Sequence, residues 1–142
     1  MIGQVTRLSL VMAGVLLSSA CQTDSRQQVL ATSASAVQLR SFQSRAFDTT
    51  DREKTLRTVI ATLQDLGFVV DNADLVLGTV SGTKLDGYQL RMTVSARPRG
   101  ASQTVVRANA QSNVTAVEEP LPYQQFFAAL ERAMFLTAHE VD

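Results

Sequence analysis

Alternating apolar and polar residues dominate the middle of the chain. In residues 87–98 the apolar positions recur at every second residue, and residues 103–112 repeat the pattern. The apolar members are Leu90, Met92, Val94 and Ala96 in the first segment and Val106, Ala108 and Ala110 in the second. A period of two is typical of strands that bury one face and leave the other in water. Proline and glycine in residues 97–102 predict a loop, so the two strands are expected to form a hairpin.

Further extended segments are predicted on the N-terminal side of this hairpin. Residues 37–47 have mixed alternation and are expected to form a first strand. Residues 68–70 begin another strand, residues 71–74 are expected to turn, and residues 75–84 continue as an extended segment. Glycines within this region are assigned to a bulge and to turns between strands.

A helical period separates the first strand from the others. Leu56, Val59, Ile60 and Leu63 follow the spacing i, i+3, i+4 and i+7, which places them on one face of a helix. Thr50 and Glu53 have the spacing of a capping box, and Asp48 is an alternative cap. Gly67 is expected to end the helix in the left-handed conformation, with Phe68 contacting Leu63 as in a Schellman motif.

A second helix is predicted after Pro120 and Pro122, because proline is tolerated in a first helical turn. Its apolar face would comprise Tyr123, Phe126, Phe127, Leu130 and Met134, widened by Phe135 and Leu136. The element order is then β-α-β-β-β-α, with room for extra edge strands. Two amphipathic helices and strands with one apolar face predict an α+β fold. We expect a two-layer sandwich, in which an antiparallel sheet of about four strands carries both helices on one face.

The N-terminus has a different pattern, that of a secretory signal. Arg7 precedes an apolar run in residues 8–17, and the small residues 18–20 follow. The run is roughly ten residues, about half of the ~20 that a transmembrane helix needs, so a permanent span is not expected. Residues 1–20 are interpreted as a signal peptide and residues 21–36, rich in Gln, Ser, Thr and Ala, as a flexible tether. Residues 37–142 are expected to form a single domain.

Cys21 is the only cysteine, and cleavage after Ala20 would make it the first residue. The stretch "LLSSAC" resembles a bacterial lipoprotein signal, although Ser18 holds a place that is usually leucine. The resemblance implies that Cys21 is acylated and that the membrane is a partner through this N-terminal lipid anchor. Gln22 implies sorting to the outer membrane, with the domain facing the periplasm. The alternative is an ordinary secreted protein that keeps a free thiol.

The segments "FDTTD", "LQDLGF" and "YQQFFAALERAMFLTAHE", with Gly78 and Lys84, resemble a little-characterised family of small proteobacterial outer-membrane lipoproteins. This resemblance covers about residues 42–140. Several members carry a glycine-rich apolar insertion after the lysine, where this chain has only "LDGYQ". The layout of a tether and an α+β unit is also similar to accessory lipoproteins of outer-membrane assembly and secretion machines.

Composition and charge argue against several classes of function. The chain has 13 basic and 13 acidic residues, and this balance argues against nucleic acid as a partner. His139, the only histidine, is placed in the last turn of the final helix and has no nucleophile motif to serve. Metal ligation is not expected, since Asp71–Asp74 lacks the other residues of a calcium loop. We therefore predict a non-enzymatic protein with no cofactor, no metal and no catalytic residues.

Four arginines are the candidate binding residues: Arg91, Arg97, Arg99 and Arg107. They fall on the wet face or the tip of the predicted hairpin, and Arg40 or Arg45 could join them from the first strand. Guanidinium groups pair bidentately with carboxylates and phosphates. We predict a lipid-anchored accessory protein that binds a protein component of an envelope complex, such as a secretion, pilus or assembly machine. One alternative is that these arginines only keep the face solvated and bind no partner. A second is that the protein is a small-ligand or peptidoglycan-binding module with a cavity between the helices and the sheet.

Overall fold

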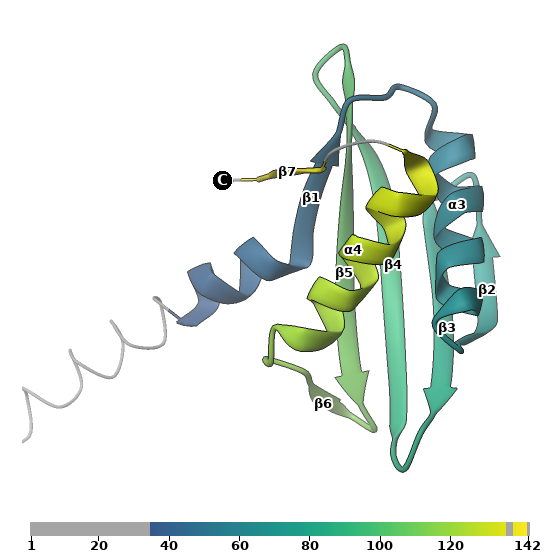
Figure 1. Ribbon diagram of the computed structural model, residues 1–142, viewed down its shortest axis with the longest axis vertical. Coiled ribbons are helices and arrows are strands. Elements are labelled where there is room, and N and C mark those ends of the chain that lie inside the picture. Colours follow the sequence, from purple (N-terminus) through teal and green to yellow (C-terminus); the bar gives the residue numbers. More distant parts are fainter. Residues whose placement is uncertain (1–34, 136–137, 142) are drawn as a thin grey trace, which may run out of the picture. The chain divides into compact units, whose positions relative to one another are not determined.

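An antiparallel sheet with two helices on one face forms the domain (Figure 1). The computed structural model describes residues 35–135 and 138–141, so the predicted signal peptide and Cys21 lie outside the described residues. Contacts group the chain from Gln38 onward into one compact unit. Its elements are β1 (Ser44–Phe47), α3 (Arg52–Asp65), β2 (Val69–Asp74), β3 (Thr79–Leu85), β4 (Gln89–Arg99), β5 (Gln103–Ser112), β6 (Thr115–Ala116), α4 (Leu121–Met134) and β7 (Ala138–Glu140).

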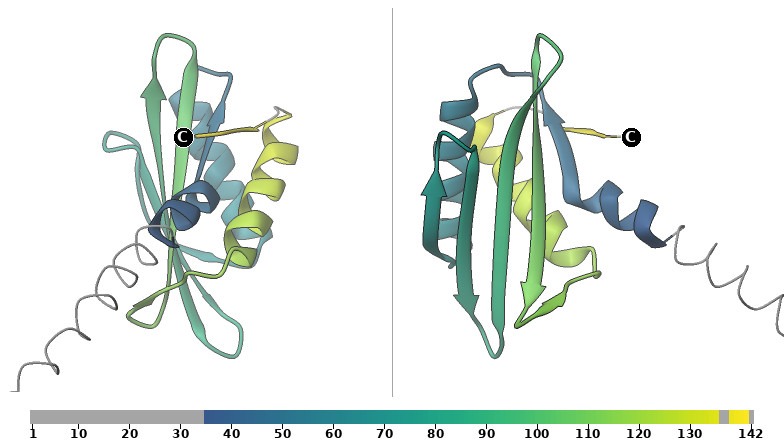
Figure 2. Two further views of the ribbon diagram at one scale, coloured as in Figure 1. Left: turned by 90° about the vertical axis from the view of Figure 1, so that its left-hand side faces the viewer. Right: turned by 180° about the vertical axis from the view of Figure 1, so that it is seen from behind.

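In the described part of the chain the sheet has seven strands: six follow the order β2-β3-β4-β5-β1-β7, and β6 pairs with the end of β5. Seen from behind, the strands face the viewer and both helices lie beyond them (Figure 2, right). The predicted α+β sandwich is therefore present, but the expected count of about four strands is too low. Two of the additional strands, β6 and β7, have two and three residues, too few for an alternating pattern to be visible in the sequence. The third arises because residues 68–84 form two separate strands, β2 and β3.

Both helices bury the faces that their periodicity predicted. Leu56, Val59 and Leu63 of α3 are fully buried, and so are Tyr123, Phe126 and Leu130 of α4. Opposite them, the apolar positions of β4 and β5 are buried, which confirms the predicted alternation. Burial of such side chains contributes roughly 1.5–3 kcal/mol each for the larger ones, so this interlayer core is the main source of stability.

The end of α3 follows the predicted Schellman geometry. Gly67 has φ +85°, its N–H donates to Gln64 O, and the N–H of Phe68 donates to Leu63 O. The start of α3 differs from the prediction, because neither Thr50 with Glu53 nor Asp48 caps it. Asp51 is the N-cap, and its carboxylate accepts the N–H of Lys54 at 2.9 Å.

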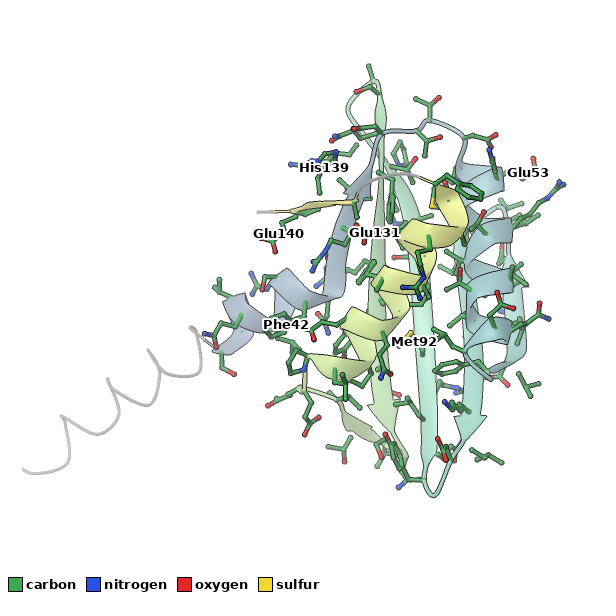
Figure 3. All side chains as sticks on the ribbon, in the orientation of Figure 1. Phe42, Glu53, Met92, Glu131, His139 and Glu140 are labelled. Atoms are coloured by element: carbon green, nitrogen blue, oxygen red, sulfur yellow. The ribbon has the colours of Figure 1, made fainter. Side chains whose placement is uncertain are left out.

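The C-terminal segment also departs from the predicted helix. Phe135 adopts a left-handed conformation with φ 56°, ends α4 and is 93% exposed, so it does not extend the apolar face. His139 lies in β7, paired with Ala46 of β1, and not in the last helical turn. The N–H of Ala138 donates to the Glu131 carboxylate of α4 at 2.9 Å, which holds the start of this short strand (Figure 3).

The segment before β1 is helical instead of extended. Residues 35–43 form a helix, of which 35 and 36 are the only described members of the predicted tether, and the strand begins at Ser44. Leu39 and Phe42 are three residues apart and pack against the core. Their helical spacing, not strand alternation, decides the conformation of this segment.

The predicted turn at residues 71–74 is part of strand β2, and the turn occurs at residues 75–78. Two features place it there. Gly78 supplies the positive φ of +73°, and the Asp74 carboxylate accepts the N–H of Leu77 at 2.8 Å. A register shift between Val70 and Asn72 marks a bulge at Asp71, which hides the strand period in the sequence.

Candidate partner-binding surface

The outer face of the sheet, opposite α3 and α4, is polar along its three central strands. In the paired register, β3 contributes Thr79, Ser81 and Thr83, β4 contributes Arg91, Thr93, Ser95 and Arg97, and β5 contributes Val105, Arg107, Asn109 and Gln111. Only Val105 is apolar in this set. Neither helix covers this face (Figure 2), so these side chains are available to another molecule.

Arg97 and Arg107 lie together on the outer face. Arg107 pairs with Ser95 and Arg97 pairs with Val105, which makes the two arginines diagonal neighbours. Such neighbours have Cα atoms about 7–8 Å apart, within reach of long side chains. Both are exposed, and among the described residues no carboxylate forms an ion pair with either. The two strands therefore hold two unpaired cations side by side.

Arg91 is also on the outer face but is separated from this pair. It pairs with Gln111, four residues along β5 from Arg107, or roughly 13 Å at the rise of an extended strand. Its guanidinium lies 3.6 Å from the carboxylate of Asp71. That carboxylate also accepts the hydroxyl of Thr83 at 2.6 Å. Arg91 is thus partly neutralised within the protein.

The other arginines have different surroundings. Arg99 is exposed at the end of β4, next to the hairpin loop, and pairs with Gln103 across it. Arg45 is on the helix side of β1, where its guanidinium lies 5.3 Å from the ring centre of Phe127. Arg40 is exposed in the helical residues before β1. Neither Arg40 nor Arg45 joins the outer-face arginines.

Asp48 joins two segments that are far apart in the sequence. Its carboxylate accepts a hydrogen bond from Gln103 Nε2 at 2.7 Å and lies 2.9 Å from His139 Nε2. The hydrogen bond from Gln103, followed by that from His139, lowers the pKa of Asp48, while burial opposes the shift. Asp48 and His139 are exposed, and among the described residues no serine, threonine or cysteine side chain is hydrogen-bonded to His139. It links β1, β5 and β7 without forming a catalytic constellation.

We expect Gln103→Ala to raise the pKa of Asp48 toward the ordinary aspartate value, because the Gln103 hydrogen bond favours the carboxylate. A carboxylate with a lowered folded pKa stabilises the fold above the unfolded pKa, and this contribution disappears as the pH falls through the folded value. NMR titration of the Asp48 carboxyl carbon measures the shift. Gln111→Ala, on the same strand, is the control, and an equal Asp48 titration in both variants would contradict the assignment.

Residues for metal or cofactor chemistry are not gathered in the described part of the chain. No cluster of three His, Cys, Asp or Glu residues occurs among them.

A cavity of about 140 Å³ lies where the β3–β4 turn meets the start of α4. It is lined by Lys84, Asp86, Tyr88, Leu90, Leu121, Pro122 and Gln125. Ligand pockets usually have about 300–1,000 Å³. The interior between helices and sheet is filled by core side chains such as Met92 (Figure 3).

The sequence matches no protein-family model and no curated protein. Among the described residues, no helix has both the length and the apolar character needed to cross a membrane.

The sequence did not predict two side-chain contacts near this surface. Asp71 was assigned to a turn, so its pairing with Arg91 was missed, and the bulge beside it leaves no local signal. The contact between Asp48 and His139 joins residues 91 positions apart. The strand period does, however, place Arg91, Arg97 and Arg107 correctly on the face away from the helices.

Proposed function

We propose that this chain is a lipid-anchored, periplasm-facing accessory protein that binds an acidic surface on a component of an envelope complex. The proposal depends on one observation, the adjacent and unpaired cations of Arg97 and Arg107 on the uncovered sheet face. Like charges on neighbouring strands disfavour each other, so the isolated domain does not benefit from this grouping. A partner carboxylate would favour it, because guanidinium and carboxylate form strong bidentate pairs.

The proposed location comes from the N-terminal pattern. The apolar run ahead of Cys21 and the small residues before it support lipidation. Gln22 then favours sorting to the outer membrane. The resemblance to small proteobacterial outer-membrane lipoproteins points to the same place. A tethered domain needs a partner within reach, which favours a component of the same envelope.

A small-ligand or cell-wall module is less well supported. The cavity beside Lys84 is smaller than usual ligand pockets, and Lys84 itself lies 3.7 Å from the Asp86 carboxylate. A catalytic role is not proposed: His139 Nε2 lies 2.9 Å from the Asp48 carboxylate at the surface, and within residues 35–135 and 138–141 no nucleophilic side chain is hydrogen-bonded to it. The outer face therefore remains the better candidate for function.

Replacing Arg97 and Arg107 together by serine should weaken capture of the partner at least about tenfold. Loss of two cations removes charge-assisted contacts, which are strongest at low salt. Folding should persist, because exposed substitutions usually change the free energy of unfolding by no more than about 0.5 kcal/mol. The measurement is the yield of co-purified proteins from detergent-solubilised membranes, identified by mass spectrometry at low and high salt.

Arg91→Ser is the matched control, because Arg91 is on the same face but already pairs with Asp71. It should reduce capture much less than the double substitution. If the folded double variant captures the same proteins at an equal yield, the outer face is merely solvated. An equal loss in the Arg91 variant would instead show that total charge matters and not the Arg97–Arg107 pair.

A further inference from the structure

The cavity beside the β3–β4 turn has the size of a single side chain. Its volume is about 140 Å³, and an engineered protein cavity of about 150 Å³ holds a molecule of benzene. Tyr88 and Leu121 line the cavity and are 54% and 59% exposed, so a group from another molecule can reach it. The cavity is therefore small for a usual ligand but large enough for one aromatic ring.

The lining of the cavity suits such a ring. Its apolar part consists of Leu90, which is buried, together with Leu121 and Pro122. Lys84 also lines it, on the helix side of the sheet, because it pairs across the strands with Leu90. An ammonium group within about 6 Å of an aromatic ring attracts its face. An aromatic side chain would thus gain both apolar contact and this attraction, whereas an aliphatic one would gain only the first.

Local structure holds the walls of the cavity in place. The N–H of Asp86 donates to Tyr88 O at 3.2 Å, which closes the β3–β4 turn, and Gly87 supplies the positive φ of +74°. On the other side, Pro120 is the N-cap of α4 and Pro122 lies in its first turn, where their rings fix the backbone. Because the walls are preorganised, binding between them costs little conformational entropy.

Unpaired acidic groups lie beside the cavity, just before α4. Glu118 and Glu119 are both exposed and directly precede the proline that begins the helix. Among the described residues neither glutamate forms an ion pair, with Arg40 or with any other cation. Their carboxylates are therefore available to a cation on another molecule.

The other cations near this end have partners within the protein. Lys84 lies 3.7 Å from the carboxylate of Asp86, and Arg91, on the opposite face of the sheet, lies 3.6 Å from that of Asp71. The guanidinium of Arg45 donates to two nearby backbone carbonyls and lies over an aromatic ring of α4. These contacts leave the two glutamates without a cation, and a basic segment complements them.

We propose that this cavity binds a basic segment of a protein partner, which inserts one aromatic side chain. The ring would fill the cavity beside Lys84, and lysines or arginines next to it would pair with Glu118 and Glu119. An aromatic anchor in a pocket, surrounded by weaker contacts, is the usual energetic centre of a protein interface.

This site is separate from the Arg97–Arg107 pair and selects the opposite charge. Leu90 and Arg97 are seven residues apart on β4, roughly 23 Å at the rise of an extended strand. Leu90 is also on the helix side, whereas Arg97 is on the outer face. The domain could therefore hold a basic segment and an acidic surface at once, and this inference does not depend on the proposed function.

Binding of short peptides to residues 21–142 with Cys21→Ser tests the proposal, because this chain carries no acyl group. The probe is the pentapeptide Lys-Lys-Phe-Lys-Lys, acetylated and amidated at its ends. In amide NMR spectra it should shift Tyr88, Leu90 and Gln125 to saturation. The peptide with alanine in place of phenylalanine should bind at least about tenfold more weakly, because the anchor is lost. With glutamates in place of the lysines, binding should weaken at least about threefold.

Matched variants locate the site. Leu121→Ser removes one wall of the cavity and should weaken peptide binding at least about tenfold; if it impairs folding, Tyr88→Ser replaces it. Glu118→Gln with Glu119→Gln should weaken binding at low salt and much less at high salt. Val76→Ser, an exposed apolar position on the turn at the opposite end of β3, should leave binding unchanged.

Arg97→Ser with Arg107→Ser should also leave peptide binding unchanged, so failure of this proposal is distinguished from failure of the proposed function. Equal binding of the phenylalanine and alanine peptides, shifts confined to other parts of the domain, or full binding by the Leu121 variant would each overturn the proposal. Free benzylamine supplies a ring and a cation without a peptide. If it binds as tightly as the pentapeptide, the cavity is a site for small aromatic amines and not for a protein segment.

Discussion

Replacing Gly78 by alanine should lower the free energy of unfolding by about 2–4 kcal/mol. Gly78 has φ +73°, a conformation that costs an L-residue roughly 1–2 kcal/mol. A Cβ there would also lie 2.8 Å from the backbone oxygen of Ala96, which cannot rotate away as a side chain would. Relief of this clash would disturb the hydrogen bond from Ala96 N to Gly78 O. Urea unfolding of the chain from residue 21 with Cys21→Ser measures the loss.

Gly87→Ala separates the two causes. Gly87 has nearly the same φ, +74°, but a Cβ there would have no atom within 4 Å. Its cost should be conformational only, about 1 kcal/mol. If both variants lose equal stability, the close approach of Gly78 to β4 contributes nothing. A larger loss for Gly78 would show that the packing of the β2–β3 turn on β4 stabilises the sheet.

The elements that were predicted correctly are those whose pattern is local. The face of α3 follows from residues within one 14-residue segment, and its Schellman end depends only on Leu63, Gly67 and Phe68. The alternation of β4 and β5 likewise stays within single strands. Local periodicity is sufficient where one face of an element is buried against the core.

Two of the errors occur where a distant residue decides the structure. Strand β7 forms because it pairs with β1, some 90 residues earlier, and its three residues have no period of their own. Asp48 fails as a helix cap because its carboxylate is used by Gln103 and His139. The error at residues 75–77 has a local cause instead: these apolar residues looked like part of a strand, but their neighbours Asp74 and Gly78 form a turn that leaves them exposed.

The same distinction applies to the candidate surface. The strand period alone predicts which arginines face away from the helices. The register between strands decides which of them are neighbours, and it depends on pairing that no single segment encodes. For this reason Arg97 and Arg107 are together, while Arg91 is apart and paired with Asp71.

Replacing Tyr123 by phenylalanine should lower the free energy of unfolding by about 2–3 kcal/mol, although the ring is kept. The sequence predicts Tyr123 only as a member of the apolar face of α4, and it is fully buried. Its hydroxyl donates to Val117 O at 2.7 Å and accepts the N–H of Ala110 at 3.2 Å and Gln43 Nε2 at 3.4 Å. Without the hydroxyl, these polar groups lose a partner in a buried site, and an unsatisfied buried group costs roughly 1–3 kcal/mol.

Tyr88→Phe is the matched control, because Tyr88 is the other tyrosine and is 54% exposed. Its removal of a solvated hydroxyl should change the unfolding free energy by no more than about 0.5 kcal/mol. Amide exchange adds a local measurement: in the Tyr123 variant the N–H of Ala110 should lose protection more than those of Ala108 and Val106. The hydroxyl joins β5, the segment before α4 and the helical residues before β1, so its loss should loosen all three together. Equal stability of the two variants would mean that water or backbone adjustment satisfies the freed groups, and that Tyr123 contributes only its ring.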